Sequence, residues 1–358
     1  MTKRFQFCNN RIISAVSTAQ GVTFKDGPTE IIITGNIVDV PGVIGLEVQS
    51  ATSGKTVVSN NIVTNPEIGI SFSSTEHFTA TGNFTIACTT YGIEAAQGAK
   101  NGTIVGNTMA NCFIGAVASG ASCINVLIGS NTITNATSMG VQVQLGTQLN
   151  VKGNTILNCA GDYGIYADTV SRSTISGNHV SCTVAPTGNG NAIFMSGNDN
   201  TVSANDVDYT ALGSPKGYGI TFNTCARARI QNNNIHGKHY KSMYSSGGSD
   251  IVIDGNTTSG ATEDSLNLTS SGLVVMPTHT TMGDSSNIAY AGGGTFRQGI
   301  VFRSYDYTLR WNSVLDLYNQ TVTTSAPSAG GAGALPATPL GYIQVKIEGS
   351  VRRIPFYA

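Results

Sequence analysis

Short runs of alternating apolar and polar residues follow one another along most of the chain, with turn-forming residues between them. One feature marks the period: an Asn that usually follows a small residue and stands two positions before a mostly apolar one. The marker occurs at Asn36, Asn60, Asn83, Asn107, Asn131, Asn154, Asn178, Asn205, Asn233 and Asn256. Successive markers lie 23 to 28 residues apart. A regular period of this length indicates a repeat architecture.

Other positions keep the same phase as the marker. The residue three places before it is apolar in every copy, as at Ile33, Ile128 and Ile253. A second apolar segment follows the marker, and a third begins with Gly in most repeats, as in residues 69–72. Each repeat therefore predicts three short strands whose side chains point alternately to opposite faces.

One repeat cannot bury its own apolar side chains, whereas stacked repeats pair each strand with its copy one coil away, about 4.8 Å along the axis. We therefore predict an all-β fold, a single-stranded parallel β-helix of about 11 coils with about 24 residues each. At that spacing the coils form a rod of roughly 50 Å. The marker Asn is expected to take the left-handed backbone of a tight corner and to bond to its copies in neighbouring coils.

Composition agrees with an ordered, turn-rich protein. Charged residues are only 11%, 43 residues are Gly, and 40% are hydrophobic, which argues against disorder. A net charge of −1 gives no electrostatic footprint for nucleic acid, and no apolar run is long enough for membrane insertion by a helix. The seven cysteines show no metal-ligand spacing, and Cys88, Cys112 and Cys159 share one phase, which predicts a buried stack of reduced thiols. We expect no metal and no cofactor.

The coil period and the Asn ladder resemble those of the pectate-lyase-like right-handed parallel β-helices, a group that includes pectate lyases, polysaccharide epimerases and bacteriophage tailspikes. The resemblance covers about residues 9–270 and rests on the period, not on a catalytic motif. It implies a right-handed helix, but it leaves the activity open because one fold hosts many functions.

The chain after the repeats has a different composition, and the period fades after Leu273. The last residues predict a hairpin with strands at 342–347 and 351–357, and they resemble a short C-terminal β element of phage fibres and spikes. We therefore divide the chain into a parallel β-helix rod over 1–270, a β-rich trimerisation region over 271–322, a linker over 323–334 and a C-terminal β-hairpin element over 335–358.

Candidate binding residues gather where the coils are longest, near 184–190 and 208–217. Stacking is expected to bring the polar and aromatic residues of this region to one flank of the rod. They are Asp162, Tyr163, Tyr166, Asp168, Tyr209, Lys216, Tyr218, His239 and Lys241. Aromatic rings cover sugar faces and polar groups bind hydroxyls, so we expect glycan contacts from Tyr163, Tyr166, Tyr209, Lys216, Tyr218 and His239. Solvated loop residues are the alternative interpretation.

The sequence gives weaker support for catalytic residues than for glycan-binding residues. Glu47 and Glu94 occupy the same outward phase two coils apart, roughly 9.6 Å, which is at the edge of the range for an inverting glycosidase. Asp162 and Asp168 flank one strand of a single coil. Any of these carboxylates is otherwise a surface residue that aids solubility, so the sequence leaves open whether the protein is an enzyme.

The resemblance to virion proteins implies a homotrimeric phage fibre or spike that attaches to host-surface polysaccharide. It also implies assembly in the host cytoplasm, a place on the particle surface, and other virion proteins against the open N-terminal edge of the coils. A tailspike depolymerase, either a hydrolase or a lyase, is one alternative. A structural head fibre or decoration protein without a ligand is another.

Overall fold

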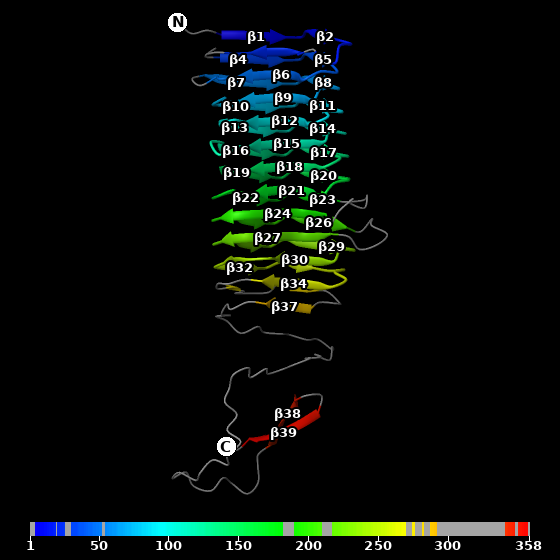
Figure 1. Ribbon diagram of the computed structural model, residues 1–358, viewed down its shortest axis with the longest axis vertical. Coiled ribbons are helices and arrows are strands. Elements are labelled where there is room, and N and C mark those ends of the chain that lie inside the picture. Colours follow the sequence, from blue (N-terminus) through cyan, green and yellow to red (C-terminus); the bar gives the residue numbers. More distant parts are fainter. Residues whose placement is uncertain are drawn as a thin grey trace. The chain divides into compact units, whose positions relative to one another are not determined.

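Three parallel β-sheets built from β1 to β37 form the larger part of the protein in a computed structural model. It describes residues 4–18, 20–25, 30–51, 54–181, 190–209, 217–269, 274–275, 281–282, 287–291, 341–347 and 350–356. The chain divides into two units, Met1–Gly299 and Ile300–Ala358. Figure 1 shows the first unit as coils stacked from β1 to β37, each coil contributing one strand to each sheet.

Each sheet has twelve successive strands among the described residues, and β31 (Gly248–Ser249) pairs beside β27 in the third. Sheet 1 contains β1 (Arg4–Cys8), β4 (Glu30–Thr34), β7 (Lys55–Ser59), β10 (Phe78–Thr81), β13 (Lys100–Val105), β16 (Ile124–Gly129), β19 (Thr147–Lys152), β22 (Thr174–Ser176), β25 (Thr201–Ser203), β28 (Arg229–Gln231), β32 (Ile251–Asp254) and β35 (Val274–Val275). Sheet 2 contains β2 (Arg11–Ile13), β5 (Ile37–Asp39), β8 (Ile62–Thr64), β11 (Phe84–Ile86), β14 (Thr108–Ala110), β17 (Thr132–Thr134), β20 (Thr155–Leu157), β23 (His179–Ser181), β26 (Asp206–Tyr209), β29 (Asn234–Gly237), β33 (Thr257–Thr258) and β36 (Thr281–Met282). Sheet 3 contains β3 (Val22–Phe24), β6 (Ile44–Gln49), β9 (Ile68–Ser73), β12 (Tyr91–Ala96), β15 (Ile114–Ser119), β18 (Met139–Gln144), β21 (Tyr163–Asp168), β24 (Asn191–Asn198), β27 (Tyr218–Ala226), β30 (Lys241–Ser245), β34 (Asp264–Thr269) and β37 (Asn287–Ala291).

The expected all-β parallel solenoid is confirmed, and its interior is one continuous apolar core. Alternate residues of each strand point inward, so Ile104, Ile128 and Val151 stack in sheet 1 with no exposed surface. The predicted cysteine stack is also buried, because Cys88, Cys112 and Cys159 are each 1% exposed. Burial of apolar surface in this core is the main stabilising contribution.

The buried Asn ladder satisfies every hydrogen-bonding group of its amides. The Asn131 Nδ2 donates to Asn154 Oδ1 at 2.9 Å and to the Ile104 carbonyl at 2.8 Å. Its Oδ1 accepts from the backbone N–H and the Nδ2 of Asn107, at 2.9 and 3.1 Å. An Asn amide has two donor hydrogens and two acceptor lone pairs, so all four sites are used. The same pattern repeats at Asn83, Asn154, Asn178 and Asn205.

Two details of the predicted ladder are wrong. The residue in the ladder is Asn61, which bonds to Asn36 and Asn83, while Asn60 precedes it with a φ of 55°. The left-handed backbone thus belongs to the residue before the ladder Asn, as in Gly82 and Gly106, whose φ angles are 63° and 65°. The Asn itself contributes its amide. Adjacent asparagines in the sequence concealed the one-residue difference.

In most sheet 3 strands the second residue is a glycine, because the backbone of the neighbouring coil approaches it closely. A Cβ on Gly140 would lie 2.6 Å from the Gly164 carbonyl oxygen and 2.5 Å from Ile156. Real Cβ atoms do not approach backbone oxygen so closely, so this corner of the coil excludes a side chain.

The coils continue beyond the expected end of the rod at residue 270. Strands β35, β36 and β37 pair in parallel with β32, β33 and β34, which adds a coil up to Ala291. Farther along, β38 (Gly341–Ile347) and β39 (Ser350–Phe356) form an antiparallel hairpin where the sequence predicts one. The turn at 348–349, the linker at 323–334 and most of the proposed trimerisation region lie outside the described residues.

Replacing Asn131 by Ala should lower the free energy of unfolding by about 3 kcal/mol. The change leaves two N–H groups of Asn107 buried without partners and removes one donor from the Ile104 carbonyl. A buried group that loses its partner costs about 1–3 kcal/mol. Urea unfolding followed by circular dichroism measures the difference. The control is Asn150→Ala, because the Asn150 amide bonds only to the nearby Gln148 carbonyl at the surface. Equal stability of the two variants would contradict the structural role of the ladder.

Candidate functional site

Aromatic side chains line the outer face of sheet 3 over four consecutive coils. Strand alternation turns Ile165 and Ala167 inward and Tyr166 outward. Tyr163 stands at the start of the strand, before Gly164, and its half-buried ring lies against that of Tyr166. Two columns follow from the strand register. Tyr163 aligns with Asn191, Tyr218 and Lys241, and Tyr166 aligns with Phe194, Thr221 and Tyr244.

The rings form two clusters. In the first, the ring centroids of Tyr163, Tyr166 and Phe194 lie 4.7 to 5.6 Å apart, and Tyr166 stacks on Phe194 at an interplanar angle of 16°. In the second, the Tyr218 and Tyr244 centroids are 5.1 Å apart. We call these five aromatic residues the aromatic platform. Because they pack edge to face and face to face, their orientations are held before any ligand arrives.

Polar groups lie between and beside the two clusters. The Thr221 hydroxyl donates to Asn191 Oδ1 at 2.9 Å, which places a hydrogen-bonded pair between the clusters. The Lys241 ammonium lies 5.8 Å from the Tyr218 centroid and 5.1 Å from the Tyr244 centroid, within range of a cation–π interaction. It is also 3.6 Å from a carboxylate oxygen of Glu263.

Burial and, to a smaller extent, neighbouring carboxylates raise the pKa values of the two phenols in the first cluster. Burial and the nearby charge of Asp168 raise the pKa of Tyr166 to about 12. Burial and the charge of Asp162 raise the pKa of Tyr163, against a smaller lowering by its hydrogen bond to Asn191. Both hydroxyls therefore remain hydrogen-bond donors at any physiological pH.

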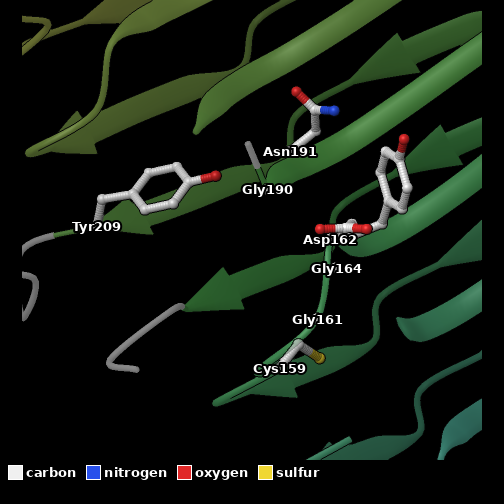
Figure 2. A pocket seen from close by; sticks show the side chains of 8 residues that line it. Cys159, Gly161, Asp162, Gly164, Gly190, Asn191 and Tyr209 are labelled. Atoms are coloured by element: carbon white, nitrogen blue, oxygen red, sulfur yellow. The ribbon is translucent and has the colours of Figure 1, made fainter. Parts of the chain in front are cut away.

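Two of the predicted glycan-binding residues are buried, and those predictions are corrected here. Tyr209 is 1% exposed, and its hydroxyl donates to the Tyr218 carbonyl at 2.9 Å. Figure 2 shows that hydroxyl pointing toward Gly190, in a hollow already filled by surrounding side chains. His239 is 0% exposed, packs against the Tyr209 ring and lies 2.7 Å from the Ser242 hydroxyl. Burial lowers the pKa of His239 to about 4, so it is a neutral core residue.

Of the remaining candidates, Tyr163, Tyr166 and Tyr218 lie on the platform, and Lys241 lies over Tyr218 and Tyr244. Asp162 directly precedes β21, and Asp168 is the last residue of that strand. Lys216 lies outside the described residues. Phe194 and Tyr244 were missed, although they share the outward phase of Tyr166. The signal was available, because carrying that phase through the longer coils reaches Phe194, Thr221 and Tyr244 in turn.

Glu47 and Glu94 share a column of sheet 3 with Ser71 between them, as their phase predicted. Glu47 is 8% exposed and accepts from the Thr23 hydroxyl at 3.1 Å. Glu94 accepts from the Ser71 hydroxyl at 2.7 Å. Burial raises the pKa of Glu94, and the charges of Glu47 and Glu67 raise it further against the lowering by Ser71. A raised pKa suits a carboxyl that donates a proton.

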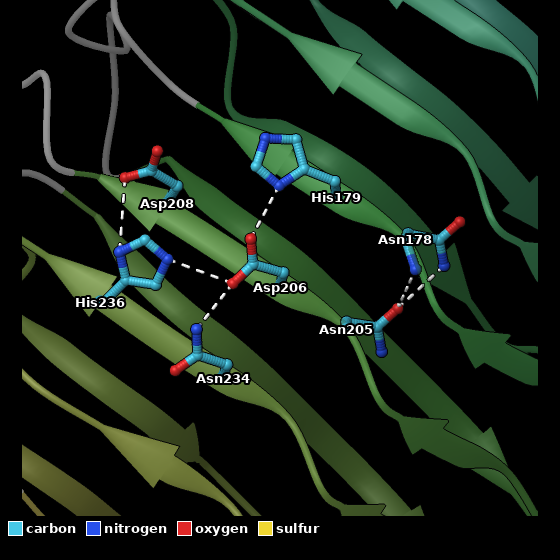
Figure 3. A network of polar contacts seen from close by, with 7 residues as sticks. All are labelled: Asn178, His179, Asn205, Asp206, Asp208, Asn234 and His236. Carbon is cyan, nitrogen blue, oxygen red and sulfur yellow. Dashed lines mark hydrogen bonds and ion pairs between the residues drawn. The ribbon is translucent and has the colours of Figure 1, made fainter.

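A second polar cluster joins three coils on the outer face of sheet 2 (Figure 3). The Asp206 carboxylate lies 2.8 Å from His179 Nδ1 and 3.1 Å from His236 Nε2, and it accepts from Asn234 at 2.7 Å. The other ring nitrogen of His236 is 3.5 Å from Asp208.

Across the described residues, no three or more His, Cys, Asp or Glu side chains are arranged to hold a metal ion. Nor does any helix in that part of the chain have the length and apolar character to cross a bilayer.

Replacing Asp206 by Asn should destabilise the protein by about 1 kcal/mol at pH 7, since the carboxylate is partly solvated. Partial burial raises the pKa of Asp206, but hydrogen bonds from Asn234 and His179 and the charge of His236 together lower it. A lowered pKa gives stability that is present above the unfolded-state value of about 3.9 and is lost as the pH falls through the folded-state value. Urea unfolding should therefore show the deficit at pH 7 and a progressively smaller deficit as the pH falls below the unfolded-state value of about 3.9. The exposed Asp250→Asn is the control, and a deficit independent of pH would contradict the assignment.

Comparison with solved structures finds β-helical proteins at low identity. The catalytic unit of the GH87 α-1,3-glucanase of Streptomyces thermodiastaticus is 16% identical, with a TM-score of 0.43 over 82% of this chain and 63% of the glucanase. The Dettilon tailspike protein is 14% identical, with a TM-score of 0.39 over 82% of this chain and 60% of the tailspike. Tailspike protein 3 of bacteriophage CBA120 is 10% identical, with a TM-score of 0.37 over 97% of this chain and 56% of that protein.

This chain therefore spans about 60% of the length of these structures. No curated protein sequence matches it. A family model does match, and its description is "Right handed beta helix region". The match covers residues 69–210 and 191–328, which is more than half of the chain. With three parallel sheets and stacked coils in the structure, the chain belongs to the right-handed β-helix family.

Proposed function

We propose that this protein is a subunit of a phage fibre or spike, a homotrimeric rod that binds a host-surface glycan through the aromatic platform. The observation that carries the proposal is the platform itself, five aromatic side chains on four consecutive coils of one face. Sugars bind to aromatic rings through their apolar C–H faces and to neighbouring polar groups through their hydroxyls.

The arrangement of the platform suits a linear chain of sugars along the rod axis. Four coils span about 14 Å at the spacing of parallel strands. The first cluster and the second cluster then form two stacking sites, and the Asn191–Thr221 pair lies between them to bind hydroxyl groups. The coils hold all these groups on a rigid sheet, which reduces the entropy lost on binding.

Trimerisation and attachment are assigned to two other parts of the chain. Phe5 in β1 is 49% exposed, and because exposed apolar surface favours a partner, we assign contacts with other virion proteins to this coil. The β38–β39 hairpin carries the sequence that resembles the terminal element of virion fibres, and we assign trimer contacts to residues 271–358.

Depolymerase activity is the second candidate function, and the column of Glu47, Ser71 and Glu94 favours it. A protonated Glu94 could donate to a glycosidic oxygen while a second carboxylate activates water, as inverting glycosidases require. Release of new reducing ends from host polysaccharide separates the two functions, because a binding protein releases none.

Replacing Phe194 or Tyr244 by Ala should weaken glycan binding by about tenfold, or 1–2 kcal/mol, since each change removes one ring of a stacked pair. Binding to an array of bacterial surface polysaccharides measures the effect. The matched control is Phe113→Ala, an aromatic residue that is 45% exposed outside the platform. Equal binding by all three variants, or no binding by the unaltered protein, would contradict the proposal.

The full chain should have a mass in solution of three times 37.1 kDa, about 111 kDa. A variant that ends at residue 334 should lose mass toward a single chain, because it lacks the hairpin element. Multi-angle light scattering measures both. A stable full-length monomer would refute trimerisation.

A further inference from the structure

The carboxylates around the aromatic platform restrict the kind of sugar that it can bind. Asp162 is exposed next to Tyr163, and Asp168 lies at the end of the same strand beside Tyr166. We propose that the platform selects neutral glycans and rejects polymers that carry carboxylate, sulfate or phosphate groups. This inference rests on the glycan-binding function proposed above and names its substrate class.

Hydrogen bonds from neutral side chains hold Asp168 in place. Its Oδ1 accepts from the Ser196 hydroxyl at 2.6 Å, and its Oδ2 accepts from Gln144 at 3.4 Å. Neutral donors orient a carboxylate without neutralising it. Within the described part of the chain, no Lys, Arg or His forms an ion pair with Asp168 or with Asp162.

Lys241 is the cation on the platform in the described residues, and its charge is already balanced. Its ammonium lies over the rings of Tyr218 and Tyr244 and 3.6 Å from Glu263. The Lys241 side chain is only 17% exposed, so a ligand anion has little access to it. One lysine against the three carboxylates of Asp162, Asp168 and Glu263 leaves two negative charges.

The same carboxylates are suited to neutral sugars. A carboxylate accepts hydrogen bonds from sugar hydroxyls, and such charge-assisted bonds are stronger than neutral ones. An acidic sugar stacked on Tyr163 or Tyr166 would instead place a second negative charge within a few ångströms of Asp162 or Asp168. Like charges at that distance repel, and low-dielectric aromatic surroundings strengthen the repulsion. Discrimination therefore comes from an unfavourable contact with the wrong ligand as well as from favourable stacking with the right one.

Chemically matched probes test the inference. Purified uronic-acid-containing capsular polysaccharides are compared with their carboxyl-reduced forms, which keep the same linkages but lose the charge, alongside polysaccharides that are neutral by nature. We expect binding to neutral and carboxyl-reduced polymers, with affinities that hardly change with salt. Tighter binding of an acidic polymer than of its reduced form would overturn the inference while leaving glycan binding intact. Absence of binding to every polymer would overturn the glycan-binding function itself.

A charge variant provides the second arm. In the double variant Asp162→Asn, Asp168→Asn, the affinity for an acidic polymer relative to its reduced form should rise about tenfold, because the repulsion is removed. The control is Asp250→Asn, which removes an exposed carboxylate at a corner before sheet 1. An unchanged affinity ratio in the double variant would contradict the assigned role of the two carboxylates.

Discussion

The buried ladder of asparagine amides is the interaction on which the stacked coils depend. A parallel solenoid turns a corner at every strand end, and each corner brings polar backbone groups into the interior. Here the ladder amides bond to one another and to a backbone N–H of the neighbouring coil. Each also donates to a sheet 1 carbonyl of the preceding coil, as Asn131 does to Ile104. Because every donor and acceptor has a partner, the ladder fixes the register of adjacent coils at no cost in unsatisfied polar groups.

Register then determines the outer surface. Once Asn131 lies over Asn154, every outward residue lies over its copy in the next coil, and distant residues become neighbours. Tyr166 and Phe194 stack although 28 residues separate them in the sequence. The same constraint brings His179, Asp206 and His236 together on another face. Surface chemistry in this protein is therefore a consequence of coil phase, and a rigid sheet holds it in position before a ligand binds.

The fold could be predicted from sequence because its signal is repeated many times. The spacing of apolar residues, the marker Asn and the Gly of the third strand recur in coil after coil. An error in one coil, such as Asn60 in place of Asn61, therefore does not change the predicted fold. The extra coil at residues 274–291 was missed because its two shortest strands have two residues each and carry no marker Asn.

The candidate site could be predicted only in part. Tyr163, Tyr166 and Tyr218 were found because they lie in or next to the Gly-containing strand of their repeats, and their positions in that strand indicate the flank of the rod on which they lie. Tyr209 and His239 were misplaced, because they stand at the ends of longer coils, where the phase is interrupted and a polar aromatic residue can turn inward. The Tyr209 hydroxyl donates to the Tyr218 carbonyl there, and His239 Nε2 lies 2.7 Å from the Ser242 hydroxyl. Sequence phase alone does not reveal such local partners.

The distance between two residues of one outward column tests the stacked-coil account most directly. Thr132 and Thr257 lie in the same column of sheet 2, linked by the successive pairs through Thr155, His179, Asp206 and Asn234. Pulsed electron paramagnetic resonance on nitroxide labels at these two positions, in protein diluted with unlabelled chain, measures their separation. Five coil steps predict about 24 Å, broadened by the label linkers. A distance that differs from this value by more than the label linkers allow would contradict the register of the coils. It would also contradict the aromatic platform, which depends on that register.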